Sequence, residues 1–112
     1  MSATRRRIPF GILVQAVCDA AGEDVSDVYT GCRHEAVVAA RRAIVLLARR
    51  HTTMSFQEIA RRLGRRTHSG VYQMHLAAHG THNETWLSLL ERATELARVR
   101  ADAVRLSQEE RS

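Results

Sequence analysis

Arginine is the residue type with the most evident chemistry in this chain, and its distribution is uneven. Between residues 33 and 66 the sequence holds nine arginines and two glutamates, a net charge of +7, while the whole chain carries +5. A guanidinium group is permanently charged, and its forked donors fit phosphates and base edges. A segregated positive block favours a polyanionic partner, with nucleic acid as the first candidate. A basic surface without a partner is the alternative.

Two helices that would position these arginines are predicted by the stretch SFQEIARRLGRRTHSGV, residues 55–71. Ser55 and Glu58 have the spacing of a capping box, which starts a helix. Gly64 stands where a left-handed residue would end that helix, and Thr67 can cap the next one. A short helix, a glycine corner and a second helix form a helix-turn-helix, whose second helix enters the major groove of DNA. The alternative is a plain helical hairpin with a charged surface.

The segments around this corner also predict helices, and none predicts a strand. Apolar residues recur at helical spacing from about Pro9 to Gly22, from His34 to Arg50 and from Thr67 to Gly80. In the second of these segments the arginines fall mostly off the apolar face. Between residues 24 and 32 we expect a connection with at most one helical turn.

The C-terminal part predicts one long amphipathic helix. Thr81 and Glu84 form a second capping box, and an apolar stripe then runs to about Leu106, before a tail, SQEERS, that we expect to be disordered. The stripe consists of Trp86, Leu90, Ala93, Ala97 and Val104. It either covers the core or pairs with a second copy or another protein. We accordingly divide the chain into a helix-turn-helix domain, residues 1–80, and a C-terminal helix and tail, residues 81–112.

The segment ARRAIVLLARRHTTMSFQEIARRLGRRTHSGV, residues 40–71, resembles the C-terminal DNA-binding domain of the bacterial replication initiator DnaA. Several matching positions are polar or glycine, which core patterning does not explain. The matches are Arg41, Leu47, Ala48, Thr52, Ser55, Glu58, Ile59, Gly64, Arg66, His68 and Val71. The resemblance implies an all-α fold: a helical bundle of the Trp-repressor/DnaA C-terminal type with a helix-turn-helix, here with a long C-terminal helix added. It also implies binding to double-stranded DNA.

The resemblance extends to the contact residues. The family segment that corresponds to GRRTHSGV carries base and phosphate contacts. Arg66 matches directly, and His68 and Ser69 keep possible donors. Thr67 replaces an aspartate that helps to read a base and Gly70 replaces a threonine, so we expect a different DNA site or a weak sequence preference. Taking charge, pattern and resemblance together, we predict DNA binding by Arg33, Arg41, Arg42, Ser55, Arg61, Arg62, Arg65, Arg66, Thr67, His68, Ser69 and Gln73.

The sequence argues against enzymatic and metal-dependent functions. A phosphate loop of the form G-x-x-x-x-G-K-[ST] needs a lysine, and the chain has none, so we expect no ATPase activity. His75 and His79 have the spacing of metal ligands on a helix, but surface or phosphate-contacting histidines are the favoured interpretation. We predict no catalytic residue, no metal and no cofactor. Cys18 and Cys32 are interpreted as reduced thiols of a cytoplasmic protein, because they lack a CxxC spacing and no apolar run reaches the length of a membrane span.

Two functions follow from these observations. The first is a double-stranded DNA-binding protein without ATPase activity, acting in transcription regulation or in DNA replication. The alternative is a protein-interaction adaptor that keeps the DnaA-like scaffold but has lost specific DNA reading. In either case a homodimer or a protein partner through the helix at residues 84–106 is possible.

Overall fold

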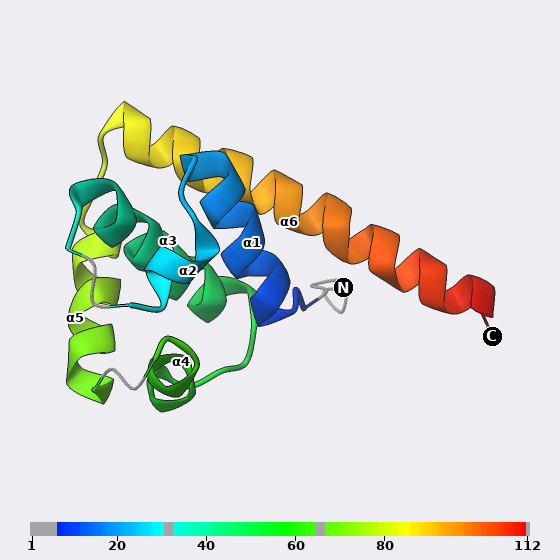
Figure 1. Ribbon diagram of the computed structural model, residues 1–112, viewed down its shortest axis with the longest axis horizontal. Helices are drawn as coiled ribbons and strands as arrows, with labels where there is room; N and C mark the ends of the chain where they lie inside the picture. The colour runs from blue at the N-terminus through cyan, green and yellow to red at the C-terminus, as the bar shows by residue number, and fades with distance from the viewer. Residues whose placement is uncertain (1–6, 31–32, 65–66, 112) are drawn as a thin grey trace.

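The protein is an assembly of helices, shown by a computed structural model that describes residues 7–30, 33–64 and 67–111 (Figure 1). The helices are α1 (Phe10–Ala21), α2 (Val25–Val28), α3 (Glu35–His51), α4 (Phe56–Arg62), α5 (His68–His79) and α6 (Glu84–Arg111). No strand occurs in these described ranges. The predicted all-α fold with a helix-turn-helix and a long C-terminal helix is therefore confirmed.

Helix α3 forms the centre of the bundle, because it contacts each of the other five helices. Every residue from Ala43 to Ala48 is buried, so this stretch has no solvent-facing side. A helix that is apolar all round is stable only when neighbours cover it on every side. The sequence predicted one apolar face for this segment, whereas the helix is buried on every side between Ala43 and Ala48.

The predicted helix starts and stops are largely confirmed. Helix α1 begins after Pro9 and ends at Gly22, which has a left-handed φ of 72°. The short connection predicted after it contains one turn of helix, α2, in which the Asp24 carboxylate accepts a hydrogen bond from the Ser26 N–H at 2.9 Å. This bond and one from the Ser26 hydroxyl hold the pKa of Asp24 below its usual range. Local capping therefore fixes the corner between α1 and α3.

The first half of α6 packs along α1 and completes the core. Trp86, Leu90, Ala93 and Ala97 are all buried in the same cluster as the α1 side chains. Four of the five stripe residues therefore cover the core, while pairing with a second copy or another protein stays a prediction. Val104, the last member, is instead 46% exposed. The stripe thus leaves the core after Ala97, and the C-terminal half of α6 extends away from the other helices in Figure 1.

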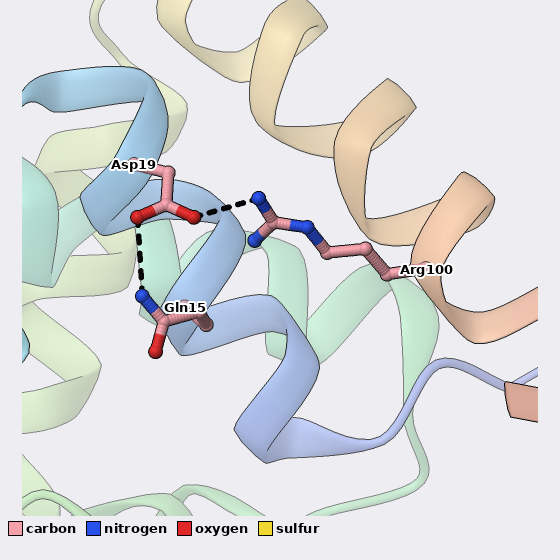
Figure 2. A network of polar contacts seen from close by, with 3 residues as sticks. All are labelled: Gln15, Asp19 and Arg100. Carbon is pink, nitrogen blue, oxygen red and sulfur yellow. Dashed lines mark hydrogen bonds and ion pairs between the residues drawn. The ribbon is translucent and has the colours of Figure 1, made fainter. Parts of the chain in front are cut away.

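A polar contact joins α1 to α6 at the edge of this interface (Figure 2). Asp19 accepts a hydrogen bond from Gln15 Nε2 at 3.1 Å and forms an ion pair with Arg100 Nη2 at 2.7 Å. The guanidinium of Arg100, with the Gln15 amide, lowers the pKa of the Asp19 carboxyl. Because both charged side chains are more than a third exposed, we expect this pair to orient α6 more than to stabilise the fold.

Two predictions for the C-terminal helix were wrong. The cap of α6 is Asn83, whose Oδ1 accepts a hydrogen bond from the Trp86 N–H at 2.8 Å, and not Thr81. The Thr81 hydroxyl instead donates to the Ala77 carbonyl at 2.7 Å and so helps to end α5. The tail expected to be disordered continues α6 to Arg111.

Among the described residues, no helix is both long and apolar enough to cross a bilayer.

Candidate nucleic-acid interface

Helix α4 begins with the predicted capping box. Ser55 Oγ accepts a hydrogen bond from the Glu58 N–H at 3.1 Å, and Glu58 Oε1 accepts one from the Ser55 N–H at 3.1 Å. The Ser55 N–H and hydroxyl both donate to the Glu58 carboxylate and hold the pKa of Glu58 below its usual range. Arg49 then fixes the start of α4 to the end of α3: Nη1 donates to the Met54 carbonyl at 2.7 Å, and the guanidinium lies 4.5 Å from the centre of the Phe56 ring.

Gly64 makes the corner between α4 and α5. Its φ is 88°, and a Cβ at this position would lie 2.8 Å from the Tyr29 carbonyl oxygen. Only glycine accepts both the left-handed backbone and this close approach without strain. In Figure 1, α4 is seen nearly end-on while α5 runs across the view. Residues 55–79 therefore do not form one continuous helix, as the prediction of a glycine corner required.

The N-terminus of α5 is capped and open to solvent. Thr67 Oγ1 accepts a hydrogen bond from the Gly70 N–H at 3.0 Å, which confirms Thr67 as the cap. A Cβ on Gly70 would lie 3.0 Å from that same hydroxyl oxygen, so the glycine gives the cap room. His68 and Ser69 are exposed in the first turn. The positive end of the helix dipole lies here, which favours an anionic partner such as phosphate.

The rest of α5 divides into an inner and an outer face. Val71 and Ala78 are fully buried or nearly so. Ser69, Gln73 and Leu76 are exposed, and their spacing of four and three residues puts them on one face. Leu76 is 46% exposed although its side chain is apolar. A third group of α5 side chains lies beside α4 and consists of His68, Tyr72 and His75. The ring of Phe56 in α4 makes edge contacts with their rings at centroid distances of 5.9, 5.3 and 5.2 Å.

Arg41 is not part of this surface. It is 3% exposed, and its guanidinium donates to three backbone carbonyls at the end of α2. The acceptors are Val28 O at 2.9 Å, Asp27 O at 3.0 Å and Thr30 O at 2.7 Å. The predicted DNA contact at Arg41 is therefore wrong: the side chain satisfies carbonyls at a helix C-terminus, where a cation is favourable.

The other predicted arginines are placed differently from one another. Arg33, Arg42 and Arg61 are exposed. Arg62 is exposed too, but its guanidinium lies 4.9 Å from the centre of the Phe10 ring, so it faces α1 as well as solvent. Arg65 and Arg66 lie outside the described residues. Charge counting grouped these arginines by sequence, whereas those that the structure describes lie before α3, in α3 and in α4.

Two basic features were missed by the sequence analysis. A groove of about 960 Å³ between α1, the end of α3 and α6 has arginines on its walls, including Arg7, Arg98 and Arg105 from outside the central block. A smaller hollow beside α5 is lined by Arg49, Arg50, Tyr72 and Leu76. No sequence spacing predicts either feature, because each joins segments far apart in the chain. Tyr72 and Leu76, which line this hollow, are exposed although both side chains are largely apolar.

The surroundings of His75 and Cys18 shift the pKa values of both side chains. No group of three metal-binding side chains occurs within the described parts of the chain. Partial burial, with the positive charges of His79, Arg49 and Arg50, lowers the pKa of His75, so this ring favours its neutral form. Burial raises the pKa of the Cys18 thiol to about 11, which makes it a poor nucleophile.

A short capped helix, a glycine corner and a second helix with an open N-terminus define a helix-turn-helix of the DNA-binding class. The family model for the bacterial DnaA protein helix-turn-helix matches residues 12–76. Because this match covers more than half of the chain, the protein belongs to that family, whose domain binds double-stranded DNA. No curated protein and no solved structure matches the chain. The matched region ends within α5, so α6 lies outside it.

Proposed function

We propose that this chain is a non-enzymatic DNA-binding protein that inserts α5 into the major groove and acts in transcription regulation or in DNA replication. Its contacts are the exposed members of the predicted set together with Arg65 and Arg66. The arginines bind phosphates, while Thr67, His68, Ser69 and Gln73 meet base edges or the adjoining backbone. No step of this function uses ATP hydrolysis.

The observation that carries the proposal is the open first turn of α5 next to exposed cations. Thr67 caps the helix, His68 and Ser69 are exposed, and Arg61 is exposed on the preceding helix. The ion pairs Asp19–Arg100 and Asp102–Arg105 both involve α6 and not the described residues of the corner. A helix N-terminus attracts phosphate through its dipole, and exposed arginines on the preceding helix add to this attraction through their charge.

A selection from random duplexes with the purified chain tests this function. We expect an enriched pool whose binding weakens steeply between low and moderate salt, because bound arginines release counterions from DNA. Enrichment would also show whether the preferred site has two symmetric halves. A chain that enriches no duplex, or whose binding is unaffected by salt, contradicts the proposal.

A protein-interaction role is the second candidate, and the projecting half of α6 favours it. Val99 is 62% exposed and Leu106 is 55% exposed, so this half carries apolar side chains that the fold does not use. Trp86, where such a contact was expected, is only 7% exposed and does not contribute. A partner bound at α6 would give an association with little dependence on salt. The same salt series therefore separates the two candidates.

A further inference from the structure

The outer face of α5 carries an apolar side chain that the fold does not explain. Leu76 is 46% exposed, although Val71 and Ala78 of the same helix are buried. It lies seven residues after Ser69 and three after Gln73, so all three share the face opposite the core. A leucine on this face therefore points in the same direction as the residues proposed to meet DNA.

The neighbours of Leu76 fit a nucleic-acid contact at this turn. The hollow that Leu76 and Tyr72 line is bounded by Arg49 and Arg50 at the end of α3. Arg50 is exposed, and Arg49 uses Nη1 for the Met54 carbonyl while its guanidinium covers Phe56. Cations beside an exposed apolar side chain are suited to hold phosphates at the rim of a groove while the apolar group meets the base edges.

Within the major groove, one base-pair feature is apolar: the C5-methyl group of thymine. Amide side chains such as Gln73 pair with the N6 and N7 positions of adenine, whereas an aliphatic side chain can only contact the methyl group. A rise of 1.5 Å per residue places Leu76 about 10 Å along the helix from Ser69, which corresponds to about three base pairs of DNA.

We propose that Leu76 reads a thymine methyl group, so that the third turn of α5 selects an A·T pair about three base pairs from the contact of Ser69. This inference rests on the proposed function, because it requires α5 to lie in the major groove. It assigns a specificity-determining residue to a position that lies beyond the capped first turn.

Replacing thymine by deoxyuridine in the selected duplex removes only the methyl group and so tests the contact directly. We expect one such replacement to weaken binding of the unchanged chain about fourfold, the effect of losing one buried methyl group. Leu76→Ala should bind the thymine and deoxyuridine duplexes equally. Leu106→Ala, which removes an exposed leucine from the projecting end of α6, should keep the full discrimination.

The outcomes separate this inference from the proposed function. A chain that binds duplex DNA but tolerates deoxyuridine at every position overturns the role of Leu76 and leaves the proposed function intact. The same holds if Leu76→Ala keeps the discrimination, if the selected site contains no thymine, or if the pool shows no preference. Absence of any duplex binding overturns both. Thermal unfolding of Leu76→Ala checks that the variant is folded.

Discussion

Two arginine-rich regions of this protein, the junction of α2 and α3 and the corner of α4 and α5, use the same side chain in opposite ways. At the junction, Arg41 is buried and donates to three carbonyls. At the corner, Arg61 is exposed in α4, the helix that precedes the open N-terminus of α5. The first arginine belongs to the fold, and the second is open to solvent, where we propose that it meets DNA.

The two regions are nonetheless connected through one backbone segment. Arg41 holds the carbonyls of Asp27, Val28 and Thr30, and Tyr29 lies between them. The Tyr29 carbonyl is the group that Gly64 approaches so closely that a Cβ would lie 2.8 Å from it. We infer that the buried arginine fixes the surface against which the helix-turn-helix corner packs. The buried arginine and the helix-turn-helix corner thus meet at the same backbone segment, residues 27–30.

The largest expected effect comes from removing the buried cation. Arg41→Ala leaves three carbonyls without their charged donor, so we expect the free energy of unfolding to fall by about 3 kcal/mol. Arg42→Ala, one residue away on the exposed side of α3, should change it by less than about 0.5 kcal/mol. Urea denaturation followed by circular dichroism measures both. Equal stability of the two variants would remove the distinction between the regions.

The link between the regions is tested at Gly64. Gly64→Ala introduces a side chain at positive φ and against the Tyr29 carbonyl, and we expect it to cost about 2 kcal/mol of stability. Gly11→Ala provides the matched control, because a Cβ there meets nothing within 4 Å and α1 should gain from alanine. Two variants that shift the unfolding midpoint in the same direction would contradict the account of the corner.

The smallest expected effect concerns pH and His75. Its pKa is lowered from 6.5 in the folded chain, so as the pH falls below that value the unfolded chain takes up the proton first. Stability should therefore decrease as the solution becomes acidic, and His75→Gln should lose this part of the decrease. Unfolding free energies of both chains at pH 8 and pH 5.5 provide the comparison. Identical pH dependences would show that the ring is not held in its neutral form.

The sequence predicted those parts of the fold that depend on neighbouring residues. The capping box at Ser55, the corner at Gly64 and the cap at Thr67 each involve a few consecutive positions, so local rules were sufficient. The cap of α6 shows the limit of such rules. Thr81 and Asn83 are both suitable residues within one turn, and the end of α5 takes the hydroxyl of Thr81.

Features that depend on packing could not be predicted. The burial of Arg41 requires the carbonyls of α2 to lie against α3, and no spacing within α3 reveals that arrangement. The exposure of Leu76 likewise depends on how α5 rests on its neighbours. The DNA contacts predicted for the exposed arginines and for the first turn of α5 stay predictions, which a binding measurement would test. Arg65 and Arg66 lie outside the described residues.

The most direct test of the central claim places a negative charge in the first turn of α5. Ser69→Glu should leave the fold intact or slightly more stable, because a carboxylate at a helix N-terminus interacts favourably with the dipole. The same carboxylate would face phosphates if α5 enters DNA. Ser107→Glu adds an equal charge near the far end of α6 and serves as the control. In an anisotropy titration with duplex DNA, the account predicts that Ser69→Glu weakens binding at least about tenfold while Ser107→Glu binds nearly as the unchanged chain does. Equal affinities of the two variants would contradict it.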